Sequence, residues 1–200
     1  MHDTFLRLPR SDFSVRGAAI ATLVAAFEAD EAVRAFYPAD RDYFLHFPGF
    51  LEVFGGRAFG SGVVDQDADG LGAALWFPPG LEPDGDAILA FMESSIPAAR
   101  LQALAAGMEL QGSMHPHEPH WYLPWIGVRP EAQGAGLGAR LLRQGLARAD
   151  AEGMPAYLEA TNRRNATLYA RHGFAVLGMV ASPGYPEIIP MWRPAMGARN

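Results

Sequence analysis

The chain has 200 residues, of which 50% are hydrophobic and 19% are charged, with a net charge of −6. This length suits one domain, and the hydrophobic fraction argues against wholesale disorder. The acidic balance argues against nucleic acid or an anionic membrane as the main partner. The chain has no cysteine, which excludes disulfides, thiolate metal sites and a cysteine nucleophile.

The N-terminal quarter of the sequence predicts helices. Residues 5–20 read as a first strand, a turn and the start of a first helix. The apolar stretch 17–27 is too short to span a bilayer, and its hydrophobic residues follow helical spacing. Acidic residues flank this stretch, so we interpret it as an amphipathic helix rather than a signal peptide, and we expect a cytoplasmic protein. Residues 42–59 are predicted to be helical, with a break near Pro48 and Gly49.

The middle of the chain predicts a hairpin, two helical segments and a strand. Two β-like runs within residues 61–80 flank an Asp/Gly turn. Residues 85–110 are predicted to be helical, with a break at Pro97. Residues 120–128, HWYLPWIGV, are aromatic and β-branched, which favours a strand. Because Pro124 cannot donate to a sheet ladder, we expect this strand to be bulged or unpaired there.

Helices and strands alternate in the rest of the sequence. Residues 136–152 predict a helix with leucines on its apolar side, and residues 155–161 predict the next strand. Asn162 is expected to cap a short helix, and Gly173 to end it. Two further strands close the chain, at residues 174–180 and 185–194. The second half therefore has the order β-α-β-α-β-β, and we predict a mixed α/β (α+β) fold.

Three alternating glycines, Gly134, Gly136 and Gly138, stand between a predicted strand and a predicted helix. They formally satisfy the dinucleotide-binding pattern G-x-G-x-x-(G/A), and Glu159 lies about twenty residues further on, as that pattern requires. Three features argue against a dinucleotide. Several residues separate Val128 from Gly134, too little chain remains for a parallel sheet of that type, and a strand that contains proline does not suit its centre.

The same loop is better described by the spacing Gln133-x-x-Gly136-x-Gly138 at the start of a helix. Glycines let the backbone approach a pyrophosphate without Cβ clashes. A helix N-terminus adds unpaired N–H donors and a partial positive charge. The sequence therefore predicts a phosphate-binding loop, with an ordinary helix-start loop as the alternative.

Longer motifs in the second half resemble those of a known family. WIGVRPEAQGAGLGARLL, YLEATNRRNATLYARHGF and a closing MWRP strand resemble the Gcn5-related N-acetyltransferase (GNAT) superfamily, and EPHWYLPWIGVRPEAQGAGLG is most similar to its puromycin N-acetyltransferase-like branch. The resemblance covers residues 115–193. It implies one domain over residues 1–200, with residues 1–114 as its acceptor-side half and 115–193 as its acetyl-CoA-binding half. It also implies a mostly antiparallel sheet with helices on both faces, and a V-shaped splay between the fourth and fifth strands, 120–128 and 156–161.

The resemblance further implies that acetyl-CoA is the co-substrate and lies in this splay. The strand backbone at Ile126 and Val128 would hydrogen-bond the pantetheine arm, as an added strand would. The N–H groups of the glycine loop would hold the pyrophosphate, and Asn165 matches an asparagine that contacts the cofactor arm. The residues assigned to cofactor binding on this basis are Ile126, Gly127, Val128, Gln133, Gly134, Ala135, Gly136, Leu137, Gly138, Ala139 and Asn165.

Direct acetyl transfer requires a neutral amine, a polarised thioester carbonyl and a proton for the departing thiolate. Tyr169 matches the general acid of the family, with a packed helix aromatic as the alternative. We assign the general base to Glu159, at the end of the second cleft strand. Glu118 and His120, just before the first cleft strand, are the alternatives, and a purely structural or solvated side chain stays open for each of the three.

His115, His117 and His120 stand close together in HPHEPH. Clustered histidines suggest a metal site, but two prolines stiffen the segment and no second ligand cluster is apparent. We therefore predict that this segment is a loop entering the strand, without a metal. The aromatics within 42–54, with Trp76-Phe77, either face an apolar acceptor amine or build the core.

We predict an acetyl-CoA-dependent N-acetyltransferase that acetylates a primary amine of a small molecule by direct attack in a ternary complex. The alternatives are acetylation of a protein or peptide amine, a non-catalytic acyl-CoA sensor and, more distantly, a dinucleotide oxidoreductase. Nucleic acid and membranes are not expected as partners. The protein is expected to be a monomer or a homodimer.

Overall fold

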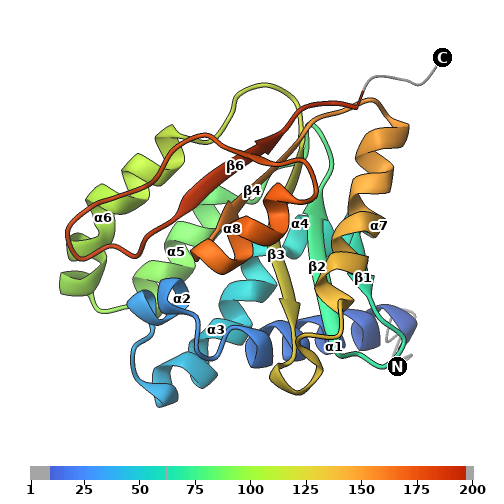
Figure 1. Cartoon of the computed structure of the whole chain (residues 1–200). Coiled ribbons are helices and arrows are strands. Elements are labelled where there is room, and N and C mark those ends of the chain that lie inside the picture. Colours follow the sequence, from blue (N-terminus) through green and yellow to red (C-terminus); the bar gives the residue numbers. More distant parts are fainter. Residues whose placement is uncertain (1–9, 62, 197–200) are drawn as a thin grey trace, which may run out of the picture.

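The computed structural model describes residues 10–61 and 63–196. Within them, one six-stranded sheet has the strand order β1-β2-β3-β4-β6-β5. β3 and β4 are parallel, and the other neighbouring pairs are antiparallel. The strands, shown in Figure 1, are β1 Val64–Gln66, β2 Gly72–Phe77, β3 Trp121–Val128, β4 Ala156–Ala160, β5 Ala175–Val176 and β6 Ile189–Arg193.

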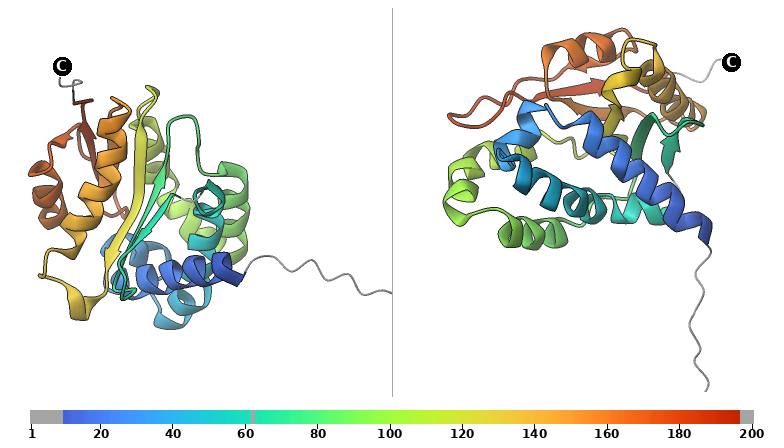
Figure 2. Two further views of the ribbon diagram at one scale, coloured as in Figure 1. Left: turned by 90° about the vertical axis from the view of Figure 1, so that its right-hand side faces the viewer. Right: turned by 90° about the horizontal axis from the view of Figure 1, so that it is seen from below.

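Helices cover both faces of this sheet. Figure 2 shows α7 and α8 on one face and α1, α3, α4 and α5 on the other. α2 and α6 lie beside the segment that leads into β6. The helices are α1 Arg10–Ala26, α2 Glu31–Phe36, α3 Asp40–Phe54, α4 Gly56–Ser61, α5 Gly85–Ser95, α6 Ala98–Ser113, α7 Leu137–Ala151 and α8 Arg163–Ala170.

Each face of the sheet has its own hydrophobic core, and β2 contributes to both. Trp76 packs with Leu141 of α7 in the first core. Leu75 packs with Phe47 and Leu51 of α3 in the second. All the residues of β2 are buried. β2 is therefore a central strand covered on both sides, which explains why its sequence is continuously apolar rather than alternating.

Several elements that the sequence predicts are confirmed. β1 and β2 form the hairpin, and α5 ends and α6 begins on either side of Pro97. The Asn162 side chain accepts a hydrogen bond from the Asn165 backbone N–H at 2.9 Å, as a helix N-cap does. Gly173 follows the end of α8 at a φ of +90°. These features depend on local backbone chemistry, which the sequence specifies directly.

The helix break expected at Pro48 is wrong. α3 runs through Pro48 and ends at Phe54, and α4 begins at Gly56. Phe47 and Leu51 are buried on either side of the proline, so packing opposes a break there. Phe44, whose carbonyl would otherwise accept the missing N–H of residue 48, is 50% exposed, so water can replace that bond.

Two predicted strands also need comment. The part of the first predicted strand before residue 10 lies outside the described residues, and from Arg10 onward the chain is α1. The strand predicted at 174–180 shrinks to Ala175–Val176 and a single bridge between Val180 and Ile188. Pro190 of β6 lies between these two pairings. Its carbonyl accepts a hydrogen bond from the Leu177 N–H, but proline has no N–H with which to donate a second bond.

β3 and β4 separate after a short parallel ladder. Only three residue pairs join them, the last being Leu123 with Leu158. The Trp121 N–H donates to the Pro155 carbonyl, so Trp121 and Leu123 face β4, and the ladder ends where β3 becomes irregular after Leu123. Beyond this point β3 stays paired with β2, while β4 pairs with β6. The predicted splay is confirmed, although its strands are the third and fourth within the described residues. Figure 1 shows them diverging.

The predicted irregularity at Pro124 is also confirmed, as a bulge against β2. Leu75 pairs with Trp125, but Phe77 pairs with Tyr122, so β3 carries one extra residue between these pairs. The bulge interrupts the alternation of side chains along β3. Trp121 and Leu123 pack in the α7 core, whereas Tyr122 stacks on Phe77 and Trp125 joins the opposite core. The bulge therefore places Tyr122 and Trp125 on the same face of the sheet.

The contact between α7 and β2 leads to the first prediction. A Cβ built at Gly145 would lie 2.1–2.3 Å from the Trp76 ring, which is itself fully buried. We expect Gly145→Ala to reduce the free energy of unfolding by about 1–3 kcal/mol, because overpacking outweighs the gain in helix propensity. Urea unfolding followed by circular dichroism measures the change.

Gly112→Ala is the matched control, because Gly112 lies in α6 and a Cβ there has no neighbour within 4 Å. It should leave the stability unchanged or raise it by up to about 1 kcal/mol. A Gly145→Ala protein as stable as wild type would contradict the close approach of α7 to Trp76.

Candidate active site

A cleft of about 680 Å³ lies where β3 and β4 separate, a volume typical of small-molecule sites. Its walls come from β3, the end of β4, α8 and the helices of the N-terminal half. Of the predicted site residues, Ile126, Glu159, Asn165 and Tyr169 line this cleft. The predicted phosphate loop follows β3 directly and is not part of the lining.

The loop after β3 leaves backbone donors without partners among the residues that the structure describes. Gly134 and Gly136 have φ values of +83° and +80°, which only glycine adopts without strain. Gly136 caps α7 and provides no side-chain hydrogen bond, so the first N–H groups of α7, from Leu137 onward, are not capped by it. Such a helix start attracts anions. The loop fits a pyrophosphate, as the sequence predicts.

Gln133 stabilises this loop from within. Its Nε2 donates to the backbone carbonyl of Val128 at 3.1 Å. The side chain therefore ties the end of β3 to the start of the glycine turn. This contact gives Gln133 a role in shaping the loop, in addition to the direct ligand contact predicted for it.

The edge of β3 that faces the splay is partly free. The backbone N–H of Arg129 donates to the Leu71 carbonyl at 2.8 Å, so the backbone groups of Arg129 face β2. Because backbone groups alternate along an antiparallel strand, Gly127 also faces β2, while Ile126 and Val128 face the opening. β4 has already diverged here. An extended ligand could pair with Ile126 as a neighbouring strand would.

Gly127 has a packing role that the sequence analysis did not identify. A Cβ at this position would lie 2.6 Å from the Cβ of Ala26 and 3.1 Å from Leu23. The missing side chain allows α1 to pack against β3. Its contact with a cofactor stays a prediction.

Tyr169 presents a free hydroxyl to the cleft. Its side chain is buried, and its hydroxyl makes no hydrogen bond with the other residues that the structure describes. Burial raises the pKa of Tyr169, and the Asp30 carboxylate raises it further. The phenol is therefore protonated at neutral pH and can act as a donor.

Glu159 is a buried carboxyl group held by three donors. Oε2 accepts from Gln111 Nε2 at 2.9 Å and from the Tyr122 hydroxyl at 3.2 Å. Oε1 accepts from the Tyr157 hydroxyl at 3.0 Å. Burial raises the pKa of Glu159, and these hydrogen bonds offset part of that effect. A carboxylate whose pKa lies closer to neutral is better matched to proton transfer at physiological pH.

A fourth side chain fixes the orientation of this network. The Tyr185 hydroxyl donates to Oε1 of Gln111. An amide oxygen only accepts, so this bond directs the Gln111 amide nitrogen toward Glu159. Gly107 leaves room for the Tyr185 ring, because a Cβ there would lie 2.1 Å from it.

Sequence reasoning missed these partners of Glu159. Tyr157 lies two residues before Glu159 on β4, so strand alternation could have placed both on one face. Tyr122 pairs with Tyr157 in the parallel register, which the two strand assignments could have suggested. Gln111 and Tyr185 come from α6 and the segment before β6, and no local pattern connects them with Glu159.

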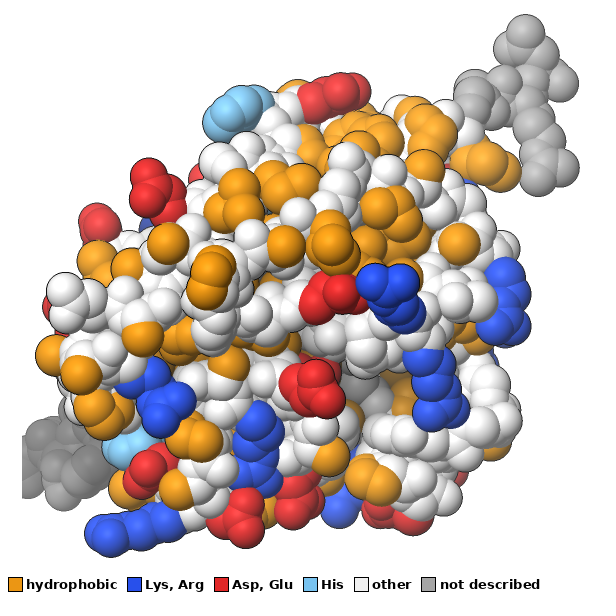
Figure 3. Space-filling model, turned by 60° about the vertical axis from the view of Figure 1, so that its left-hand side comes forward, with side chains coloured by type: hydrophobic (Ala, Val, Ile, Leu, Met, Phe, Trp, Pro, Cys, Tyr) orange, Lys and Arg blue, Asp and Glu red, His pale blue; other side chains and the backbone are white. Residues whose placement is uncertain are grey.

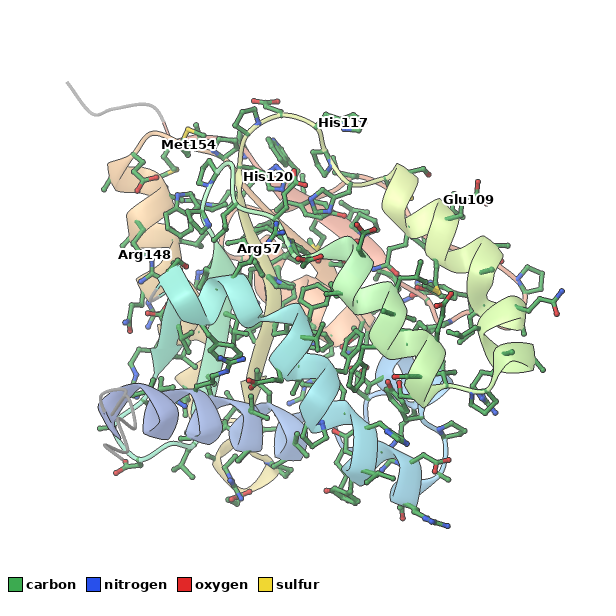
Figure 4. All side chains as sticks on the ribbon, turned by 180° about the vertical axis from the view of Figure 1, so that it is seen from behind. Arg57, Glu109, His117, His120, Arg148 and Met154 are labelled. Atoms are coloured by element: carbon green, nitrogen blue, oxygen red, sulfur yellow. The ribbon has the colours of Figure 1, made fainter. Side chains whose placement is uncertain are left out.

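The other base candidates lie outside the cleft lining. Glu118 is exposed, and its carbonyl oxygen contacts His120 Nδ1 at 2.6 Å. Figure 4 shows His117 and His120 where the chain from α6 enters β3. The described residues contain no group of three potential metal ligands at this or any other place.

His115 lines the cleft beside the Glu159 network. Its ring centroid lies 4.6 Å from that of Tyr157 and 4.8 Å from that of Tyr122. Burial, followed by the charges of His120 and His117, lowers the pKa of His115 to about 4. Its imidazole is therefore neutral at physiological pH.

The predicted aromatic wall divides into two groups. Trp76 and Phe77 are fully buried and do not line the cleft, so they build the core. Phe47, Phe50 and Phe54 of α3 do line the cleft. The alternative of a core role was therefore correct for the first pair, while part of 42–54 faces the cleft.

Comparisons with known proteins agree on one family. A family model described as "Acetyltransferase (GNAT) family" matches residues 68–174. Mycothiol acetyltransferase from Streptomyces scabiei is 31% identical over 149 residues, which cover 71% of this chain and 42% of that protein. The chain thus spans less than half the length of that relative.

Solved structures agree with this match. The structure of histone acetyltransferase HPA2 and related acetyltransferase from Corynebacterium glutamicum has a TM-score of 0.66 and 28% identity, and the alignment covers 98% of this chain and 97% of that one. Arylalkylamine N-acetyltransferase 2 from Aedes aegypti has a TM-score of 0.65 over 91% of this chain and 95% of that one. At 16% identity it shows the fold alone.

None of the helices in the described part of the chain combines the length and apolarity needed to cross a bilayer. Figure 3 views the side on which α2 and α6 lie. On this face hydrophobic side chains form small groups, and basic side chains stand singly among them.

The raised pKa of Glu159 predicts a pH-dependent contribution to stability. Because folding raises this pKa above its ordinary value of 4.5, the folded state favours the protonated form. The contribution of Glu159 is complete below that value and is lost as the pH rises through the folded pKa. We expect the stability of wild type relative to Glu159→Gln to fall as the pH rises from about 4 to about 8.

Urea unfolding of both proteins at several pH values tests this expectation. Glu118→Gln is the control, because it removes an exposed carboxyl outside the cleft, and its effect should be small throughout. If the difference in stability between wild type and Glu159→Gln does not depend on pH, the conclusion that burial raises the pKa of Glu159 is wrong.

Proposed function

We propose that this chain, which belongs to the acetyltransferase (GNAT) family, transfers the acetyl group of acetyl-CoA to a primary amine of a small molecule. The family match covers more than half of the chain, which confirms the superfamily predicted from the motifs. The puromycin N-acetyltransferase-like branch stays a prediction. The proposed reaction is direct attack in a ternary complex.

One arrangement carries this proposal. Along β3, the bulge and the free edge at Ile126 lie between the buried Glu159 network and the uncapped start of α7. A phosphate-bearing thioester therefore has an anion site at one end and proton-transfer groups at the other. Asn165 and Tyr169, one helical turn apart on α8, line the intervening cleft.

The residues of the chain fit the cofactor of the family. Acetyl-CoA supplies an activated thioester, and the N–H groups from Gly134 to Ala139 would hold its pyrophosphate. Ile126 and Val128 would pair with the pantetheine arm, and Asn165 would contact it from α8. Backbone N–H groups of the bulged strand near Ile126 would polarise the thioester carbonyl.

Glu159 and Tyr169 would transfer the protons. Glu159 accepts a proton from the bound ammonium, which leaves a neutral amine to attack the carbonyl carbon. Burial of the ammonium in the same cleft lowers its own pKa, which reduces the free-energy cost of this step. Tyr169 donates to the sulfur as the C–S bond breaks, and the second proton, which the attacking nitrogen releases as the amide forms, restores the phenol. Burial raises the pKa of this phenol, so Tyr169 is protonated and holds a proton for the departing thiolate.

Cofactor binding should depend on the open turn at Gly136. We expect Gly136→Val to weaken acetyl-CoA binding at least about tenfold, because its side chain would strain the turn and cover the helix start. Isothermal titration calorimetry measures the affinity, with NADH titrated in parallel and expected not to bind.

Gly153→Val is the control for backbone strain. Gly153 follows the other end of α7 and also has a positive φ, of +62°. A Cβ built there meets no atom of the described residues within 4 Å. The Gly153→Val protein should lose about as much stability as Gly136→Val but should keep its affinity for acetyl-CoA. Binding of NADH instead of acetyl-CoA would contradict the assignment of the loop.

Turnover should depend on the hydroxyl of Tyr169. We expect Tyr169→Phe to lower kcat about 100-fold while the affinity for acetyl-CoA is retained, because only the proton donor is lost. Turnover is measured by detecting the released CoA with a thiol reagent. The protein itself does not react with this reagent, because the chain has no cysteine.

Tyr43→Phe is the matched loss of a buried hydroxyl. Tyr43 donates to the Val24 carbonyl at 2.6 Å and is not part of the cleft lining. This variant should be less stable but should keep its kcat. An unchanged kcat in Tyr169→Phe would remove Tyr169 from the reaction, and binding of acetyl-CoA without turnover in wild type would favour a sensor.

A further inference from the structure

We propose that the acceptor is a monoamine carried on an apolar body of aromatic size and without an anionic group. This inference rests on the proposed function, because it names the amine class for the same cleft. Three observations carry it: an aromatic wall, the Glu159 carboxylate adjoining that wall, and the absence of arginine and lysine from the described lining.

The wall is a cluster of rings around Trp125. The Phe27, Phe54 and Phe47 centroids lie 5.2, 5.6 and 5.7 Å from that of Trp125, with steep interplanar angles. Phe50 joins them at 6.1 Å. All five rings line the cleft, and all but Phe47 keep part of their surface exposed. Such a surface favours a flat apolar group over a polar chain.

Aliphatic side chains from two other helices complete this apolar surface. Ile88 and Met92 come from α5, and Met108 comes from α6. Methionine adapts to irregular shapes, so these walls can accommodate a range of ring sizes. Figure 4 shows side chains filling the layer between α5, α6 and the sheet.

The aromatic wall adjoins the proposed base. The bulge at Pro124 places Trp125 and Tyr122 on one face of β3, and Tyr122 donates to Glu159. An amine whose ring rests on the wall can therefore point its nitrogen toward Glu159. Glu159 attracts the ammonium and is placed to accept its proton, because little water competes for this contact.

The lining offers no counter-charge for an anionic substrate. Its ionisable side chains are Glu82, Glu159, Tyr groups and two histidines, and no arginine of the described residues is among them. His115 is neutral at physiological pH because burial lowers its pKa to about 4. A carboxylate on the substrate would lose its hydration beside acidic groups, which excludes free amino acids as good acceptors.

A second ammonium would also be poorly matched. Glu159 is only partly exposed, and burial raises its pKa, whereas Glu82 is exposed. In an extended polyamine, the far cation would lie against apolar rings instead of water. A monoamine avoids this desolvation.

Four acceptors of related structure test the inference. Phenethylamine has the ring and one amine, phenylalanine adds a carboxylate, ethylamine lacks the ring, and putrescine replaces the ring with a second amine. We expect kcat/KM for phenethylamine to exceed that of each of the other three at least about tenfold. Equal or better values for any of the three would overturn the inference.

Two variants of α3 test the wall itself. Phe50→Ala should raise KM for phenethylamine about tenfold while the values for ethylamine and acetyl-CoA stay unchanged. Phe44→Ala, on the same helix but 50% exposed and outside the lining, should change none of them. If Phe50→Ala does not fold, as judged by circular dichroism, Phe50→Leu provides the same comparison with less lost volume. Equal losses with both amines would contradict a wall that holds the ring.

The two proposals fail in different ways. If acetyl-CoA does not bind, the proposed function is wrong, and the inference falls with it. If acetyl-CoA binds and turnover is highest with putrescine, phenylalanine or ethylamine, the proposed function stands and only the inferred amine class is wrong.

Discussion

The interruption of β3 at Pro124 is the constraint on which the candidate site depends. The Trp121 N–H donates to the Pro155 carbonyl, so Trp121 and Leu123 face β4, whereas beyond the extra residue Trp125 faces β2. The bulge therefore withdraws the N–H that would continue the ladder to β4, and it places Pro124, which has no N–H, where the pairing changes. The strand edge at Ile126 is thereby left free for a ligand. The same bulge turns Trp125 toward the face that already carries Tyr122. One local defect therefore opens the cleft, exposes its backbone donors and supplies its aromatic wall.

A second constraint is the burial of Glu159. An unpaired carboxylate in this position would be costly, and its donors come from α6, β3 and β4. The network therefore fixes these elements relative to one another around the cleft, with Tyr185 orienting Gln111 from the segment before β6. The position of the Glu159 carboxyl group therefore depends on all four of these segments. The network also holds the Glu159 carboxyl group rigidly, which suits the proton transfer proposed for it.

Local rules explain which features the sequence could predict. Pro124, the Asn162 cap and the glycine turn at Gly136 follow from backbone chemistry that one or two residues determine, so their positions were predictable. Pro48 is the instructive exception, because burial of its helical neighbours outweighs a rule that is sound in isolation. The contact of Gln111 with Glu159 joins residues 48 positions apart. Such pairs depend on how whole elements pack, which no short motif encodes.

Most rings of the proposed acceptor wall lie outside the matched family segment, although Trp125 at its centre lies inside it. The match covers residues 68–174, whereas Phe27, Phe50 and Phe54 precede it and Tyr185 follows it. The free edge of β3, the start of α7 and Tyr169 all lie inside the match. Substitutions in the outer rings would therefore change the amine that fits without displacing the groups assigned to transfer. Family membership consequently argues for the reaction, while the amine must be inferred from α1, α3 and the side chains that meet them at Trp125.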